Sequence, residues 1–309
     1  MGEVVGDGLI KLPFLAGLRA AFPGAHIAWA AAKGDTVYAT SLASVVEGLI
    51  DEIVTTPPTG IRTLDILPWV KPFGGATFDI IIDTQENLRR GAVARRGLVK
   101  DGRFISPAMA QARGAWPVAL ADRLEMLLAM AAPGARSAPL SLADKAVVAE
   151  AERLLPSGPT YVGFAPGAGG AEKRWPLRHY IALAELQVER GRTPVFFLGP
   201  QEDEERSAIE ASIPAALFPE SAAPPALRGP RFVIALAGRL SAAVANDAGP
   251  GHMLAAGGAP LLSLQKDLRK AAKFKPAASR LEMLVAEAYG EGMAALPLEA
   301  ADEALERLF

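Results

Sequence analysis

The chain has 309 residues, half of them apolar and about a fifth charged, with a formal net charge of −2 and no cysteine. This balance is typical of a folded globular protein and argues against a disordered tail or a strongly basic nucleic-acid binder. The lack of cysteine excludes disulfides, thiolate nucleophiles and cysteine metal sites.

The sequence contains no apolar run of about 18 residues and no secretory signal pattern, so we expect a cytoplasmic protein. It has three histidines and no Asp-x-Asp pair. The chain therefore has few side chains that are suited to bind a divalent metal, and we expect metal-independent chemistry.

The first half of the chain alternates helix and strand signals. The spacing of apolar residues predicts a helix over 9–22, and short apolar runs predict strands over 25–31 and 78–83. Asp7, between Gly6 and Gly8, lies where a strand is expected to end and the first helix to begin. A carboxylate there serves either as a helix cap, which is the commoner case, or as a general base.

A segment rich in Ala, Pro, Ser and Gly, residues 130–145, has the composition of a linker. We therefore predict two domains, residues 1–150 and 151–309, and allow for the last helix packing back on the N-terminal domain. The basic stretch 87–100 has two readings, a solvated helix face or a contact with an anionic acceptor or membrane surface.

The second half predicts a doubly wound α/β domain. We expect strands over 160–166, 194–199, 215–219, 243–249 and 260–265, and helices over 176–190, from about 203, over 224–237 and over 250–257. Ligands of such domains lie at strand-to-helix turns, at the carboxyl ends of the strands.

The first such turn reads PGAGGAEKRWP (166–176). Its glycines allow a ligand to approach the backbone closely, and Lys173 can direct an ammonium at a phosphate held on the loop amides. A surface turn with a solvated lysine explains the same residues equally well. The turn lacks the Gly-Lys-Ser/Thr ending of a P-loop.

The second turn reads NDAGPGHMLAAGGAP (246–260). A helix that opens near His252 points free amides and the positive end of its dipole at an anion. Asp247 as a simple N-cap, and His252 as a packed core histidine, are the competing explanations.

In order along the chain, GDGLIKLPFLAGLRAAFP, FDIIIDTQENLRR, PGAGGAEKRWP and NDAGPGHMLAAGGAP together resemble the motifs of glycosyltransferase family 9, the ADP-heptose:lipopolysaccharide heptosyltransferase-like enzymes. The resemblance implies a GT-B fold, which is α/β with two Rossmann-like domains and an interdomain cleft. A hydride-transferring dehydrogenase is disfavoured because the glycine turn lacks Gly-x-Gly-x-x-Gly.

The resemblance also implies roles for single residues. Asp7 matches the family's catalytic base and Lys173 its phosphate-binding lysine, which also assists catalysis. An acidic residue near the nucleotide ribose corresponds to Glu202, or its place is taken by Gln201. The donor-binding positions are Gly167, Ala168, Gly169, Lys173, Glu202, Asp247, Ala248, Gly249, Gly251 and His252.

Two departures from the family pattern stand out. The family begins with a longer strand such as ILVIRLGGIGD, whereas only Met1–Gly6 precede Asp7, so the first strand is expected to be shortened. After residue 265 the family continues with a Gly/Pro-rich loop, whereas this chain carries KDLRKAAKFKP. Recognition of the base or of the acceptor is therefore expected to differ.

These expectations combine into an inverting, metal-independent transferase without a bound cofactor. Its co-substrate is a nucleotide-diphosphate sugar, ADP-heptose by resemblance. The acceptor is a lipopolysaccharide-core saccharide or related glycolipid, with peripheral contact at the inner face of the membrane and no nucleic-acid partner. The alternatives are a GT-B transferase that uses another nucleotide sugar and a non-catalytic nucleotide-binding protein of the same fold.

Overall fold

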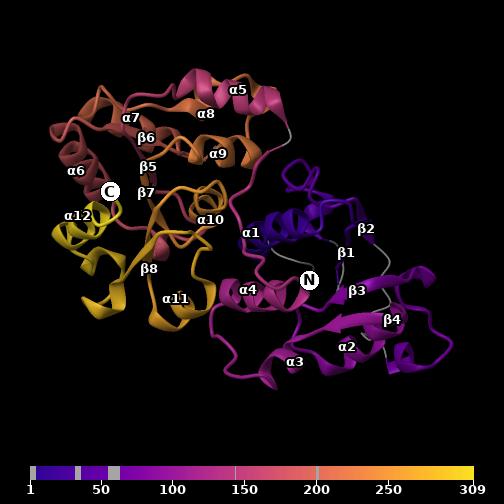
Figure 1. Cartoon of the computed structure of the whole chain (residues 1–309). Helices are drawn as coiled ribbons and strands as arrows, with labels where there is room; N and C mark the ends of the chain where they lie inside the picture. The colour runs from indigo at the N-terminus through magenta and orange to yellow at the C-terminus, as the bar shows by residue number, and fades with distance from the viewer. Residues whose placement is uncertain (1–4, 32–35, 55–62, 143, 200–201) are drawn as a thin grey trace. The chain divides into compact units, whose positions relative to one another are not determined.

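The computed structural model describes residues 5–31, 36–54, 63–142, 144–199 and 202–309. It divides into two compact units, residues 1–138 and 139–309 (Figure 1). Each unit is α/β, as expected. The expected cleft between the units stays a prediction.

The C-terminal unit is built on a five-stranded parallel sheet with the order β6-β5-β7-β8-β9. This order is that of a doubly wound fold in which the order of successive strands reverses between β5 and β7. The strands are β5 (Tyr161–Ala165), β6 (Thr193–Phe196), β7 (Ala242–Asn246), β8 (Leu261–Gln265) and β9 (Leu281–Val285).

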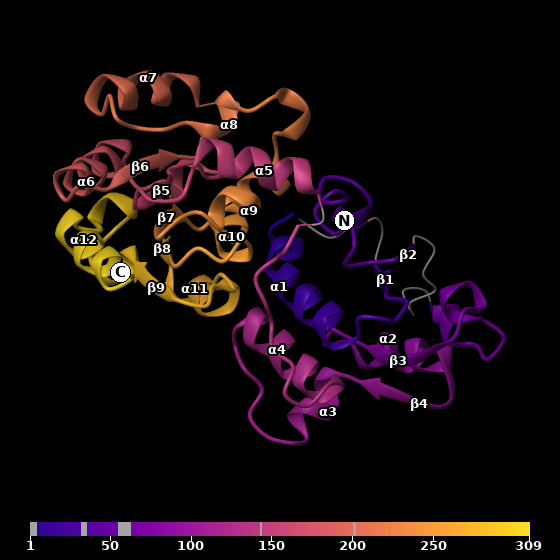
Figure 2. The same ribbon diagram turned by 45° about the horizontal axis from the view of Figure 1, so that its top comes forward.

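Helices cover both faces of this sheet, as Figure 2 shows for α6 and α12 on one side and α9 and α10 on the other. Alternate strand residues face opposite cores: Phe164 and Val244 pack with α6 and α12, whereas Ala165 and Ala245 pack with α5, α9 and α10. The helices are α5 (Lys145–Leu154), α6 (Leu177–Glu189), α7 (Asp203–Ser212), α8 (Pro219–Ala222), α9 (Pro230–Ala237), α10 (Gly249–Ala256), α11 (Leu268–Phe274) and α12 (Leu298–Glu306).

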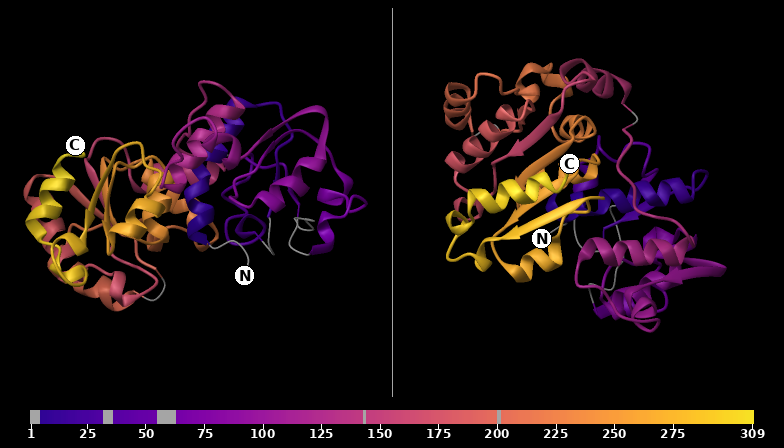
Figure 3. Two further views of the ribbon diagram at one scale, coloured as in Figure 1. Left: turned by 90° about the horizontal axis from the view of Figure 1, so that it is seen from below. Right: turned by 60° about the vertical axis from the view of Figure 1, so that its left-hand side comes forward.

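The division between the units falls earlier than the predicted boundary at 150/151, because α5 belongs to the C-terminal unit. Asp144 caps α5, and Val147 and Ala151 lie in the same core as α9. Contact of the last helix with the N-terminal domain stays a prediction. The helix buries Ala301 and Leu305 in the core of its own unit and lies beside β9 (Figure 3).

The N-terminal unit holds two separate two-stranded parallel sheets within its described residues. One joins β1 (Ala28–Ala30) to β2 (Glu52–Val54), and the other joins β3 (Phe78–Ile82) to β4 (Leu98–Ile105). The helices are α1 (Val5–Ala21), α2 (Leu88–Ala94), α3 (Pro107–Gln111) and α4 (Leu120–Ala131). Helices α1 and α4 pack together, with Gly17 close to Leu128.

The strands at 25–31, 78–83 and most of those in the second half are confirmed in type and approximate position. The expected strand over 215–219 is reduced to a single bridge between Leu217 and Val195. The expected shortened first strand falls mainly on residues 1–4, outside the described residues, and α1 already includes Val5 and Gly6.

Candidate functional site

The loops that follow β5 and β7 lie at the point where the strand order of the sheet reverses. These are the two turns singled out in the sequence, at 166–176 and 246–252. Because β5 and β7 are neighbouring parallel strands, both loops leave the same edge of the sheet. Ligands of open α/β sheets bind at this position.

Asn246 fastens the two loops to each other. It is 1% exposed, donates its Nδ2 to the carbonyl oxygen of Pro166 at 2.6 Å, and accepts the backbone N–H of Trp175 on Oδ1 at 3.1 Å. Trp175 is buried and donates its indole N–H to the carbonyl of Leu296. The loop after β5 is therefore held at both ends by buried hydrogen bonds.

Lys173 and Asp247 come together from the two loops. Lys173 ends the short helical turn Ala171–Lys173, and its Nζ lies 3.4 Å from Oδ2 of Asp247. Both side chains keep some exposure, 33% and 14%. The ammonium is thus positioned at the ligand edge of the sheet yet remains accessible to an anion.

The N-cap explanation of Asp247 is wrong. The cap residue of α10 is Ala248, in extended conformation, and no side chain bonds to the cap. Helix α10 starts at Gly249 and continues through Pro250, which has no N–H, to Gly251. A Cβ on Gly251 would contact Ala245 at 3.1 Å and the carbonyl of Asn246 at 3.2 Å, so glycine lets α10 start close to β7.

Glu202 lies beneath the glycine loop. It is 7% exposed and its Oε2 accepts the backbone N–H of Gly199 at 2.7 Å. A Cβ on Gly167 would lie only 2.3 Å from Oε1 of Glu202, so this position has no room for a larger residue. Gly169, by contrast, has open space around it. Gln201, the alternative to Glu202, is outside the described residues.

Arg174 ties Glu202 to the loop and was not assigned a role from the sequence. Its guanidinium lies 3.4 Å from Glu202, 2.8 Å from Glu205 and 3.3 Å from the carbonyl of Ala168. Burial, with the nearby Glu202 charge, raises the pKa of Glu205, and burial raises that of Glu220 to about 7. The neighbourhood of Glu202 is thus already rich in carboxylates.

His252 lies in the first turn of α10 and is buried. Burial lowers its pKa to about 4; the Asp247 charge opposes this shift and the Lys173 charge adds to it, so the imidazole is neutral at pH 7. Its Nδ1 has no hydrogen-bond partner. The ring therefore offers one unused polar atom beside the Lys173–Asp247 pair.

Asp7 lies inside the first turn of α1, and not at the end of a strand. It is half-buried and lines a cavity of about 970 Å³ that lies wholly within the N-terminal unit. Asp83, at the carboxyl end of β3, lines the same cavity and accepts the N–H of Gln85. Burial raises the pKa of Asp83.

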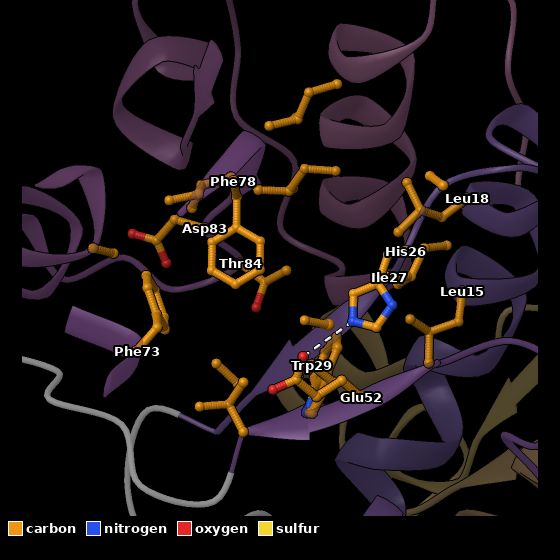
Figure 4. A pocket seen from close by; sticks show the side chains of 18 of the residues that line it. Leu15, Leu18, His26, Ile27, Trp29, Glu52, Phe73, Phe78, Asp83 and Thr84 are labelled. Carbon is orange, nitrogen blue, oxygen red and sulfur yellow. Dashed lines mark hydrogen bonds and ion pairs between the residues drawn. The ribbon is translucent and has the colours of Figure 1, made fainter. Parts of the chain in front are cut away.

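Arg90 lines this cavity as well and donates to Gln85 at 2.9 Å. Gln85, Arg90 and Asp83 all belong to the stretch FDIIIDTQENLRR, in which the sequence alone singles out no residue. Figure 4 shows Asp83 and Thr84 facing the same space as Phe73 and Phe78.

The basic stretch 87–100 does not form one helix face. Its residues are divided among α2, the turn Arg95–Gly97 and β4. Arg96 donates to three backbone carbonyls, at Asp65, Ile66 and Leu67. At least this arginine therefore holds the fold together.

No helix among the described residues is long and apolar enough to cross a membrane. The same part of the chain holds no cluster of three or more His, Asp or Glu side chains arranged to bind a metal ion.

The chain is similar in sequence to known glycosyltransferases. The model of glycosyltransferase family 9 (heptosyltransferase) matches residues 69–291, more than half of the chain. Lipopolysaccharide heptosyltransferase 1 of Pseudomonas aeruginosa is 27% identical over 274 residues, which are 84% of this chain and 75% of that protein. Lipooligosaccharide heptosyltransferase 2 of Haemophilus influenzae is 31% identical over 104 residues, 33% of this chain and only 30% of its own length.

Solved structures show the same fold at low identity. A family 9 glycosyl transferase from Veillonella parvula superposes with a TM-score of 0.66 at 19% identity, covering 100% of this chain and 95% of that one. The E. coli heptosyltransferase WaaC with ADP gives 0.62 at 17% identity, covering 99% and 98%. Its structure with ADP-2-deoxy-2-fluoro heptose gives 0.60 at 18%, covering 99% and 97%. The expected GT-B fold is confirmed.

Proposed function

The chain belongs to glycosyltransferase family 9, the heptosyltransferase family, and on that premise we propose that it transfers a sugar from a nucleotide-diphosphate donor. The donor is ADP-heptose or a relative, since two similar structures hold ADP and an ADP-heptose analogue. The acceptor is a lipopolysaccharide-core or related saccharide, since the named relatives are lipopolysaccharide and lipooligosaccharide heptosyltransferases.

The C-terminal unit holds the donor in this proposal. The observation that carries it is the pairing of Lys173 with Asp247 across two loops that a buried Asn246 locks together at the switch point of the sheet. The diphosphate lies against the loop 167–169 and the start of α10, at Ala248, Gly249 and Gly251. Glu202 is directed to the ribose.

The reaction proceeds with inversion and without a metal. The acceptor hydroxyl oxygen attacks the anomeric carbon as Asp7 accepts its proton, and the bond from that carbon to the diphosphate breaks. Lys173 and the amides of the two loops stabilise the charge on the departing diphosphate, a role that a metal has in many transferases. Neutral His252 donates or accepts one further hydrogen bond beside this charge.

The role of Lys173 is tested by Lys173→Ala and calorimetric titration with ADP. We expect Kd to rise by about 10- to 150-fold, because a hydrogen bond to a charged group contributes about 1.5–3 kcal/mol. Lys145→Ala, at an exposed lysine of the same unit, is the control and should leave Kd unchanged. An unaltered Kd for Lys173→Ala removes the phosphate role.

A panel of ADP, UDP and GDP in the same titration identifies the base.

The role of Asp7 is tested by Asp7→Asn. We expect kcat to fall at least about 100-fold, as for loss of a general base, while affinity for ADP is retained. Asp101→Asn is a suitable control, since Asp101 is exposed and has a φ of 70°, which asparagine tolerates. Full activity of Asp7→Asn would remove the general-base role, and loss of ADP binding together with unfolding would make Asp7 a structural residue.

A further inference from the structure

Two buried side chains at the ligand edge of the C-terminal unit each carry a polar atom without a hydrogen-bond partner. Several such atoms occur in the described part of the chain, but most of them belong to partly exposed residues. Nδ1 of His252 and Oε1 of Gln265 are the exceptions, on residues that are only 6% and 1% exposed. A buried polar atom without a partner is unfavourable, so each of these two atoms calls for a physical explanation.

Gln265 ends β8 on the side of the sheet that α10 covers. Side chains alternate along this strand: Leu262 and Leu264 belong to the core with α6 and α12, whereas Leu261 belongs to the core with α9 and α10. Ser263 and Gln265 therefore face α10, and Nε2 of Gln265 donates to Oγ of Ser263 at 2.7 Å. The amide nitrogen is thus engaged, and Oε1 is left as an acceptor.

The register of the sheet places Gln265 beside Asp247. Asn246 pairs with Leu264, and the N–H of Asp247 bonds to the carbonyl oxygen of Leu264. Asp247 and Gln265 are the next residues along their strands, so they are neighbours at the carboxyl edge, about 4.8 Å apart across the sheet. Gln265 therefore lies next to the Lys173–Asp247 pair.

His252 lies on the flank of α10 that is turned toward β8. A Cβ on Gly251 would contact Ala245 of β7, whereas a Cβ on Gly257 would contact the carbonyl of Ile234 in α9. Because an α-helix turns about 100° per residue, His252 and Gly257 are rotated in opposite directions from Gly251. His252 thus faces away from α9, and α10 packs on β7 and β8.

We propose that Gln265 is a positioning residue that fixes the tautomer of His252. In this arrangement Oε1 of Gln265 accepts the proton of Nδ1, directly or through one buried water, and Nε2 of the ring is left as an acceptor. The two unpartnered atoms are complementary, since one is an acceptor and the other can carry a proton. The imidazole is neutral at pH 7 and has a single ring proton. The hydrogen bond at Nδ1 then decides which nitrogen holds that proton.

On the basis of the proposed function, Nε2 of His252 accepts a hydrogen bond from a hydroxyl of the transferred sugar. An ionised diphosphate has only acceptor oxygens, so an unprotonated Nε2 cannot bond to it, whereas a sugar hydroxyl can donate. The strand order agrees with this direction. Glu202 follows β6 at the proposed ribose, the Lys173–Asp247 pair joins the loops after β5 and β7 at the diphosphate, and Gln265 follows next on β8.

The tautomer is measured on the full chain labelled with nitrogen-15 histidine, without ligand, by long-range proton–nitrogen correlation at pH 7. The chain has three histidines, and the spectrum of His252→Gln assigns the signal of His252. We expect Nδ1 to be protonated in the parent chain. In Gln265→Leu we expect the ring to change to the Nε2–H tautomer, because the acceptor for Nδ1 is lost.

Ser263→Ala is the matched control, because Ser263 lies on the same face of β8 and bonds to the same amide but leaves Oε1 in place. It should not change the tautomer. Gln265→Glu retains an acceptor oxygen and should keep Nδ1 protonated. An Nε2–H ring in the parent chain would overturn the proposal without the need for any variant, and so would a ring that stays Nδ1–H in Gln265→Leu.

The sugar contact is tested by calorimetric titration with ADP and with ADP-heptose in the absence of an acceptor. We expect Gln265→Leu to raise the Kd of ADP-heptose about 3- to 10-fold, as for loss of one hydrogen bond, and to leave the Kd of ADP unchanged. Equal weakening of both ligands, or of neither, would overturn the sugar contact. A parent chain that binds neither ligand would refute the proposed function and the sugar contact with it, whereas the tautomer is decided independently.

Discussion

Gly167 lies against the buried carboxylate of Glu202. The carboxylate of Glu202 lies where a side chain on Gly167 would have to go, and it is fixed there by Gly199 and Arg174. The glycine of this loop therefore serves two purposes in the proposed site. It leaves the amide open to a phosphate and it makes room for the group directed to the ribose.

Gly167→Ala should displace Glu202 and weaken ADP binding. Because the displaced carboxylate loses the N–H of Gly199, we expect a destabilisation of about 1–3 kcal/mol in urea unfolding. Gly169→Ala is the matched control, with open space around it, and should leave stability within about 0.5 kcal/mol of the parent. Equal ADP affinity in the two variants would contradict a ribose-side role for Glu202.

At the scale of elements, the site depends on the joining of two strand-to-helix loops. Taken alone, the first loop is equally consistent with a surface turn. In the second loop Asp247 could be a simple helix cap and His252 a packed core histidine. The buried side chain of Asn246, at the end of β7, bonds to Pro166 at the start of the first loop and to Trp175 near its end. The distance between the two loops is thus fixed by one residue in the sheet.

Asn246→Ala should separate this pair of loops. We expect a loss of about 1–3 kcal/mol in unfolding free energy, because the N–H of Trp175 is left buried without a partner. We also expect weaker binding of both ADP and inorganic diphosphate in calorimetry. Asn87→Ala removes the N-cap of α2 in the other unit and should cost about 1 kcal/mol without any effect on ADP. Unchanged diphosphate affinity in Asn246→Ala would show that the loops hold their position independently.

For the whole molecule, the proposed reaction uses residues of both units. Asp7 belongs to the N-terminal unit, while Lys173, Asp247 and His252 belong to the C-terminal unit. Each unit has its own core, and the donor-side core on both faces of the sheet is formed from residues 139–309 alone.

In the proposed reaction, protein groups neutralise the leaving diphosphate, so the intact enzyme should need no metal ion. Chelation with EDTA should leave the rate of sugar transfer unchanged, because Lys173 and the loop amides supply the positive charge. The measurement is transfer rate with excess EDTA, compared with the rate after Mg²⁺ is restored. A rate that drops with EDTA and recovers with Mg²⁺ would require a metal in the reaction.

Local sequence signals predict the C-terminal unit in some detail. Its buried strands are uniformly apolar and its helices are bounded by Pro and Gly, so local signals and tertiary packing agree at β5, α6 and β8. The ordered motifs identify the family, and the resemblance assigns both Lys173 and Asp247 to the donor-binding positions. Strands β2, β4 and β9 escaped notice because half-buried strands carry a mixed pattern of polar and apolar residues.

How those residues lie together follows from tertiary contacts. The bridging of two loops by Asn246 and the fit of Glu202 against Gly167 are contacts between residues 35 to 80 positions apart, which no local pattern encodes. The exclusion of Asp247 as a helix cap required the backbone at Ala248. The cavity of the N-terminal unit likewise depends on the fold, because its lining comes from segments that lie far apart in the chain, such as α1, β1 and β3.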